Sequence, residues 1–110
     1  MTEREYKTPC YIIDEEKLLR DFNMLKDSLE KSWNNYRIGY SFKTNSLPWL
    51  VTFLKERGVL AEVVSDDEYA LARWLGFEDR EIIYNGPVKE RSSFERALLA
   101  GGIVNLDGHR

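Results

Sequence analysis

Short β-prone runs alternate with helical patterns along this chain, and this alternation constrains its fold more than any other feature. Runs rich in β-branched and aromatic residues occur at 37–42, 60–64, 81–84 and 103–106, with a shorter run at 11–13. A segment with helical features separates each run from the next. Strands that alternate with helices form parallel sheets that are covered by those helices. The sequence therefore predicts an α/β fold.

The predicted helices are defined by apolar spacing and by capping residues. Asp14 is a candidate cap for the first helix, whose apolar residues recur every three or four positions and form one stripe: Leu18, Phe22, Leu25, Leu29 and Trp33. Ser46 is predicted to cap the second helix, with Pro48 in its first turn. Ser65 and Ser92 are each followed three residues later by glutamate, the pattern of a capping box. The last three helices are expected to end near residues 57, 76 and 101.

Two architectures accommodate this order of elements. One is a small open sheet of the flavodoxin type, and the other is the first part, about half, of a (β/α)8 barrel, whose full length is about 250 residues. A complete open sheet usually has a helix after its last strand. This sequence ends at Gly108-His109-Arg110, directly after a predicted strand. We therefore expect residues 1–110 to form an N-terminal fragment of a barrel domain.

Charge and composition argue against several classes of partner. The net charge is −3 and the basic residues are scattered, so we expect no nucleic-acid partner. The N-terminal segment is charged and lacks the apolar core of a secretory signal, and no apolar run is long enough to cross a bilayer. The single cysteine, Cys10, has no partner for an internal disulfide. We expect a cytoplasmic protein without membrane partners and without a metal site.

Lys43 is the candidate catalytic residue that position alone suggests. It follows the β-prone run at 37–42, and in an extended strand its side chain would share one face with Gly39 and Ser41. Functional groups of parallel α/β folds gather at the carboxyl ends of strands, and a lysine held there as a neutral amine can form a Schiff base. Position alone nevertheless favours a lysine that extends to solvent.

Several motifs, in order along the chain, resemble one enzyme family. Residues Tyr40-Ser41-Phe42-Lys43-Thr44-Asn45 resemble the Tyr-Ala-x-Lys-Ala/Thr-Asn motif of the fold-type III pyridoxal-phosphate decarboxylases. Four further segments are similar to motifs of the same family: Thr8-Pro9-Cys10-Tyr11, Ala61-Glu62-Val63-Val64-Ser65 with Glu68, Ile82-Ile83-Tyr84-Asn85-Gly86-Pro87-Val88-Lys89, and Val104-Asn105-Leu106-Asp107. The match covers nearly the whole chain.

The resemblance implies a fold, a cofactor and a set of site residues. The fold is a (β/α)8 barrel of the alanine racemase type, in which Lys43 would hold pyridoxal phosphate as a Schiff base. Ser41, at a position where the family usually has alanine, and Glu62 are the residues we expect beside the cofactor. The alternative for Glu62 is a strand-end carboxylate paired with a lysine such as Lys43.

Other residues within the motifs receive structural interpretations. Glu68 matches a family position near the site, but its place in a capping box explains it fully. We interpret Asn85 and Lys89 as turn and surface residues. His109 precedes the position of the ring-stacking histidine of the family, and we expect it to be an exposed terminal residue.

The resemblance favours a decarboxylase that acts on an amino acid. Diaminopimelate is the first choice of substrate, and ornithine or arginine the second. A racemase fits less well because Thr44-Asn45-Ser46-Leu47-Pro48 follows the lysine instead of the racemase pattern. A non-catalytic regulatory or binding homologue and a self-contained open-sheet domain remain alternatives.

Parts of the family's site are expected to lie beyond residue 110. They are the glycine-rich phosphate loop, the ring-stacking histidine, the acidic partner of the pyridine nitrogen and the C-terminal β-domain. We therefore expect the 110 residues alone to be inactive. We also expect a homodimer or higher oligomer, in which a second copy covers the missing half.

Overall fold

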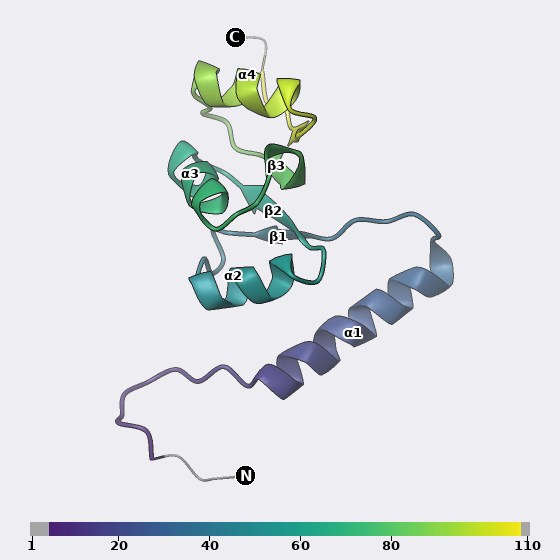
Figure 1. The fold of residues 1–110 in the computed structure, drawn as a ribbon, viewed down its shortest axis with the longest axis vertical. Helices are drawn as coiled ribbons and strands as arrows, with labels where there is room; N and C mark the ends of the chain where they lie inside the picture. Colours follow the sequence, from purple (N-terminus) through teal and green to yellow (C-terminus); the bar gives the residue numbers. More distant parts are fainter. Residues whose placement is uncertain (1–4, 109–110) are drawn as a thin grey trace. The chain divides into compact units, whose positions relative to one another are not determined.

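The computed structural model describes residues 5–108 and divides the chain into two units, Met1–Tyr36 and Arg37–Arg110. Helix α1, Glu15–Ser32, makes up most of the described part of the first unit (Figure 1). The Asp14 carboxylate accepts a hydrogen bond from the Lys17 amide at 3.1 Å, so the predicted cap is confirmed. No residue of α1 is buried, and its apolar stripe is exposed or half-buried within this unit.

The strand predicted at 11–13 is wrong. These residues have no regular secondary structure, and Tyr11 and Ile12 are exposed. A strand forms only where its amide and carbonyl groups pair with another strand, and the described part of this unit contains no other strand. β-branched residues at 11–13 therefore do not form a strand here, because no neighbouring strand is present among the described residues to pair with them.

The second unit contains a parallel sheet of four strands in the order β1-β2-β3-β4 (Figure 1). The strands are β1 Gly39–Ser41, β2 Leu60–Val63, β3 Ile82–Tyr84 and β4 Ile103–Val104. The helices between them are α2 Pro48–Lys55, α3 Asp66–Trp74 and α4 Arg91–Leu99, with a 3₁₀ turn η1, Asp79–Glu81, before β3. The four long predicted strand positions are confirmed, although each strand is shorter than its apolar run.

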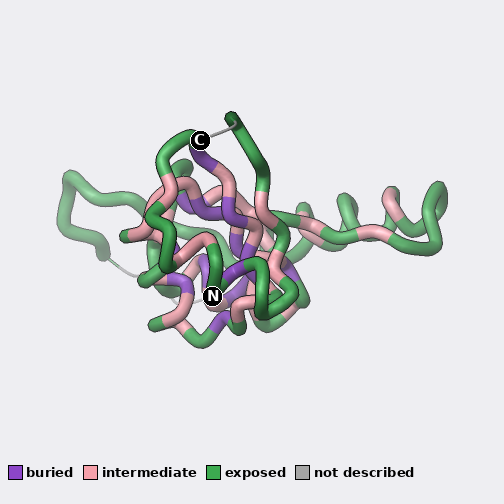
Figure 2. The backbone as a smooth tube through the Cα atoms, turned by 90° about the horizontal axis from the view of Figure 1, so that it is seen from above, coloured by how far each residue is buried: buried purple, intermediate pink, exposed green. Residues whose placement is uncertain are grey.

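One face of the sheet packs against the helices and forms the core. Alternate side chains of the strands and of the residue after β1 are buried there: Phe42, Ala61, Val63, Ile82 and Tyr84. The helices contribute Val51, Ala72 and Ala97. Figure 2 shows the buried residues gathered within this unit, whereas α1 has none. The opposite face, which we call the open face, carries no buried strand residue.

The strand order decides between the two predicted architectures. In a doubly wound open sheet the order reverses at a switch point, and helices cover both faces. Here each strand pairs with the next one in sequence, and the helices contribute to a single core on one face. Sequential parallel strands with helices on one side are the repeating unit of the (β/α)8 barrel. The prediction of a barrel portion is therefore confirmed.

Two of the predicted helix caps are wrong. Helix α2 begins at Pro48 after Leu47, and the Asn45 carboxamide oxygen accepts the Leu47 amide at 3.1 Å. Helix α4 begins at Arg91, so Ser92 lies inside its first turn and caps nothing. The capping serine of α3 is confirmed, since Ser65 Oγ accepts the Glu68 amide at 3.2 Å.

Among residues 5–108, none of the helices has both the length and the apolar content that crossing a bilayer requires.

Candidate functional site

The open face meets the carboxyl ends of the strands at one edge of the sheet, which we call the carboxyl edge. Strand pairing places Ser41, Glu62, Ile83 and Ile103 in one row across the open face. Paired residues of parallel strands point to the same side. The row therefore combines a hydroxyl and a carboxylate on β1 and β2 with two apolar side chains on β3 and β4.

Ile83 fills space that the sequence predicted to be free. A Cβ atom on Gly39 would lie 2.7 Å from Cδ1 of Ile83, so the isoleucine side chain covers the start of β1. The small face expected around Gly39 is thus occupied at that end. This leaves the carboxyl edge, at the other end of β1, as the candidate site.

Lys43 lies in the turn that follows β1. The strand ends at Ser41, and a hydrogen bond of 3.2 Å from the Thr44 amide to the Ser41 carbonyl closes the turn. Lys43 lies beyond the end of the strand, so the alternation of side chains along β1 does not determine where its side chain points. The prediction that it shares a face with Gly39 and Ser41 therefore has no basis in strand geometry. Its side chain is exposed and forms no hydrogen bond or ion pair with residues 5–108. The amine is thus available at the carboxyl edge.

Ser41 carries a hydroxyl that lacks a partner. Its Oγ atom is buried, and no hydrogen-bond partner reaches it among the described residues. A buried hydroxyl without a partner loses its hydration and gains nothing in return. Ser41 lies two residues before Lys43 and in the same row as Glu62, so a polar group of a ligand at the carboxyl edge is a candidate partner for this hydroxyl.

Glu62 pairs with an amide and not with a lysine. The Asn85 side chain donates from Nδ2 to Oε1 of Glu62 at 3.4 Å. No ion pair joins Glu62 to a basic residue in the described part of the chain, so the alternative pairing with Lys43 is not present. Asn85 is a turn residue, as predicted, but its contact with Glu62 was missed. Its place directly after β3 was the available signal.

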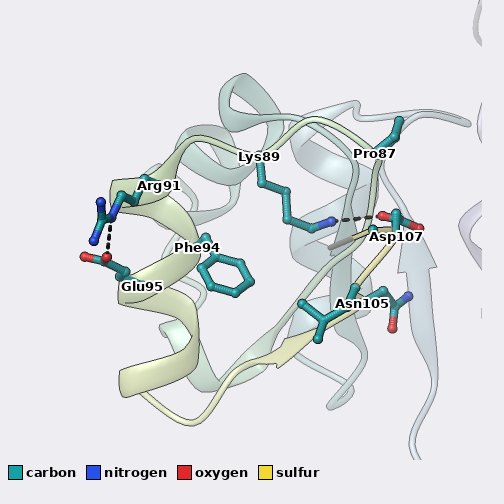
Figure 3. Close-up of a pocket in the computed structure, with 9 residues that line it drawn as sticks. Pro87, Lys89, Arg91, Phe94, Glu95, Asn105 and Asp107 are labelled. Carbon is teal, nitrogen blue, oxygen red and sulfur yellow. Dashed lines mark hydrogen bonds and ion pairs between the residues drawn. The ribbon is translucent and has the colours of Figure 1, made fainter. Parts of the chain in front are cut away.

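The prediction that Lys89 is a surface residue is wrong. Only 9% of its side chain is exposed, and its ammonium bonds to the Gly86 carbonyl and, at 3.1 Å, to Asp107 (Figure 3). The ammonium also lies 5.6 Å from the centre of the Tyr84 ring. Lys89 therefore ties the segment after β3 to the segment after β4. An acidic residue after the last strand was the signal for this pair.

A hollow of about 780 Å³ lies beside this pair, between α4 and the segment after β4 (Figure 3). Its charged side chains are paired with each other, Lys89 with Asp107 and Arg91 with Glu95 at 2.7 Å. The hollow therefore presents no uncompensated charge to a phosphate group. Its residues do not include Lys43, Ser41 or Glu62, so it is separate from the candidate cofactor site.

A polar cluster on the helix-covered side joins α3, η1 and α4. The Asp79 carboxylate accepts the Tyr69 hydroxyl at 2.5 Å and the Arg96 Nε at 3.3 Å, and it pairs with Arg73 at 3.6 Å. Burial alone would raise the pKa of Asp79, but these hydrogen bonds and positive charges outweigh it and lower the pKa. Burial and the bond to Asp79 raise the pKa of Tyr69 above 10.0. This cluster lies away from the open face and stabilises the helix packing.

The residues at the carboxyl edge suit an aldehyde cofactor better than a metal ion. In the part of the chain that the structure describes, no group of three or more histidine, cysteine or acidic residues is placed to hold a metal. The edge offers an exposed amine on Lys43, an unpartnered hydroxyl on Ser41 and an oriented carboxylate on Glu62. A primary amine binds an aldehyde, and the other two groups can contact its polar substituents. These donors fit pyridoxal phosphate.

The chain belongs to the family of pyridoxal-dependent decarboxylases, because residues 15–107 match the family model described as "Pyridoxal-dependent decarboxylase, pyridoxal binding domain". The match begins with α1 and ends after β4, so it includes Lys43, Ser41 and Glu62. The cofactor expected from the resemblance is confirmed at the level of the family.

Curated relatives agree with this assignment. The chain is 28% identical over 103 residues to diaminopimelate decarboxylase of Methanothermobacter thermautotrophicus, covering 94% of this chain and 24% of the relative. It is 32% identical over 101 residues to a probable chloroplastic diaminopimelate decarboxylase of Oryza sativa, covering 92% and 20%. It is also 32% identical over 98 residues to an L-glutamyl-[BtrI acyl-carrier protein] decarboxylase of Niallia circulans, covering 89% and 22%. The chain thus spans less than a quarter of the length of these relatives.

Proposed function

We propose that the protein carrying this chain is a pyridoxal-phosphate-dependent amino-acid decarboxylase and that Lys43 is the residue to which the cofactor attaches. The observation that carries the proposal is the position of Lys43. Lys43 carries an exposed amine in the turn after β1, with no ion pair or hydrogen bond to residues 5–108, at the edge where Ser41 and Glu62 also lie. The chain belongs to the pyridoxal-binding family.

Diaminopimelate is the substrate we favour, because two of the relatives described above are named as diaminopimelate decarboxylases. The relative from Niallia circulans is named for a glutamyl group carried on an acyl-carrier protein, so such a glutamyl group is an added candidate. Ornithine and arginine remain further alternatives from the motif resemblance. The candidates are separated by comparing carbon dioxide release from diaminopimelate, the protein-bound glutamyl group, ornithine and arginine.

Each residue at the carboxyl edge would have its own role in binding the cofactor. Pyridoxal phosphate, when bound, supplies the electron sink that stabilises the electron pair left by departing carbon dioxide. Lys43 would supply the primary amine that attaches to the aldehyde carbon. Ser41 Oγ, which has no partner in the described chain, would bond to a polar group of the cofactor. Glu62 would place a negative charge beside the amine.

The assignment of Lys43 is tested by reductive trapping. Borohydride treatment of the purified holoprotein, followed by peptide mass mapping, should locate the pyridoxyl group on Lys43. Lys43→Ala should abolish the visible absorbance of the bound cofactor and nearly all carbon dioxide release, with little change in Tm because the side chain is exposed. Lys43→Arg should fail equally, because a guanidinium remains protonated and does not attack an aldehyde.

Lys55→Ala is the matched control, since Lys55 lies on α2 near the Phe77 ring and on the helix-covered side. It should retain both absorbance and activity. A pyridoxyl group found on Lys55 or Lys89, or normal turnover by Lys43→Ala, would exclude Lys43 as the attachment site.

We propose further that residues 1–110 are the N-terminal part of a longer barrel chain, with the rest of the barrel and a C-terminal β-domain encoded after Arg110. The short coverage of the relatives supports this proposal. The 110 residues incubated with pyridoxal phosphate and diaminopimelate should release no more carbon dioxide than free cofactor. Reading the gene beyond Arg110 tests the domain proposal directly.

We also propose that copies of the 110-residue chain associate into a dimer or higher oligomer. The outer edges of β1 and β4 are unpaired within residues 5–108, and such edges recruit other chains. Light scattering at micromolar concentration should show a mass above that of one chain, and a folded monomer would contradict this.

A cytoplasmic location is proposed from the lone cysteine, Cys10, and fractionation of cells tests it.

A further inference from the structure

Asn85 and Glu62 face each other across neighbouring strands at the carboxyl edge. Strand pairing aligns Glu62 with Ile83, and Asn85 follows the end of β3, two residues beyond Ile83. From there the amide nitrogen Nδ2 reaches back to Oε1 of Glu62 at 3.4 Å. It is the only side-chain hydrogen bond that Glu62 makes with residues 5–108.

The turn after β3 determines which way the Asn85 amide points. Its Oδ1 accepts the Gly86 amide at 2.9 Å, so the donating Nδ2 must face Glu62. The Asn85 backbone amide bonds to the Val63 carbonyl at 2.8 Å, which anchors the residue to the end of β2. The orientation of the donor is therefore set by the backbone before any ligand binds.

An amide orients a carboxylate without neutralising it. A lysine or arginine at position 85 would form an ion pair and cancel much of the charge on Glu62. The neutral amide fixes one oxygen and leaves the negative charge available to a cationic nitrogen at the carboxyl edge. Lys43 and the amino group of an incoming amino acid are nitrogens of this kind.

From this geometry we infer that Asn85 is a positioning residue that holds the Glu62 carboxylate towards the cofactor. The inference rests on the proposed function, because it assumes that pyridoxal phosphate binds at Lys43. Asn85 itself need not touch the cofactor. Its effect is transmitted through the single bond between Nδ2 and Oε1.

Asn85→Asp is the most informative variant. It preserves the acceptor for the Gly86 amide and the shape of the side chain, but it replaces the donor with a second carboxylate facing Glu62. We expect a lower Tm and about a tenfold increase in the dissociation constant for pyridoxal phosphate, the size of effect for a lost hydrogen bond to a charged group. Asn105→Asp is the control, because Asn105 follows β4, is exposed and makes no hydrogen bond to a carboxylate in the described chain.

A double substitution separates positioning from general stability. Asn85→Asp combined with Glu62→Gln restores one donor and one acceptor with their places exchanged, so the Tm should return to near the wild-type value. The negative charge then lies on residue 85, after β3, instead of on residue 62 of β2, and the affinity for pyridoxal phosphate should remain low. Glu62→Gln alone provides the reference affinity: if Asn85 acts through the Glu62 carboxylate, adding Asn85→Asp to it should weaken pyridoxal phosphate binding no further, whereas an effect of Asn85 independent of Glu62 would add a second loss.

The measurements use the full-length protein freed of pyridoxal phosphate: Tm is recorded first, and the dissociation constant is then obtained by absorbance titration with added cofactor. If Asn85→Asp matches Asn105→Asp in both, or if the double variant recovers wild-type affinity, the positioning role is refuted while Lys43 trapping by borohydride still supports the proposed function. If wild-type protein traps no pyridoxal phosphate on Lys43, the proposed function fails and the role of Asn85 fails with it.

Discussion

Gly86→Ala should be the most destabilising of the small substitutions at the carboxyl edge. Gly86 is buried in the turn after β3 and has a φ of +103°. An added Cβ would overlap the carbonyl oxygen of Val64 and lie 3.1 Å from its carbonyl carbon and 3.2 Å from its Cα. These are backbone atoms at the end of β2, so they cannot move without disturbing the pairing of β2 with β3.

Two separate costs determine the magnitude. A left-handed backbone conformation costs an alanine about 1–2 kcal/mol relative to glycine. Forcing an extra carbon into a packed site costs about a further 1–3 kcal/mol. The free energy of unfolding should therefore fall by about 2–5 kcal/mol, a large part of the 5–15 kcal/mol that typically stabilises a domain.

Urea denaturation followed by circular dichroism measures the change. Gly58→Ala provides the control, because Gly58 also has a positive φ, +81°, but a Cβ there would have no atom within 4 Å. It should show only the conformational cost of about 1–2 kcal/mol. Equal losses for the two variants would mean that the Val64 carbonyl does not restrict position 86, and the steric argument would be refuted.

Three further predictions concern the polar side chains. Because the pKa of Asp79 lies below 3.8 in the folded state, its stabilising contribution should be lost as the pH falls below about 3.8, and Asp79→Asn should flatten this part of the stability profile. Because the pKa of Tyr69 is raised, the free energy of unfolding should fall as the pH rises above about 10, and Tyr69→Phe should lessen that fall. Lys89→Met should cost about 1–2 kcal/mol in urea denaturation, because it removes bonds made by a side chain only 9% exposed, whereas Arg91→Ala, which breaks a surface pair, should cause no measurable change.

The order of elements in the second unit could be predicted because local signals agreed with one another. Glycines at the helix ends and Ser65 at the start of α3 fixed the boundaries to within a few residues. The strand predicted at 11–13 lacked such a constraint, because β-propensity does not supply a pairing partner. The prediction that Ser92 caps a helix was wrong for a related reason. A capping pattern does not specify which residue takes the extended conformation before the helix.

The family could be predicted from the motifs, but the geometry of the candidate site could be predicted only in part. The motif resemblance selected Lys43 and Glu62, but strand alternation extended past the true end of β1 and assigned Lys43 to a face that the turn does not impose. The burial of Lys89 depends on Asp107, eighteen residues away. The contact between Asn85 and Glu62 depends on strand register, which a single sequence does not reveal.

The sequential order of the strands has a consequence for how this sheet is made. Each new strand pairs with the one that immediately precedes it, so every contact between strands joins segments close in the chain. Parallel pairing is intrinsically slow, and closures of only 20 or 21 residues keep its entropic cost as small as this topology allows. On a ribosome, β1 and β2 have both emerged once Val63 has left the exit tunnel, and each later strand finds its template already in place. The sheet is thus suited to growth in the direction of translation, one strand and its helix at a time.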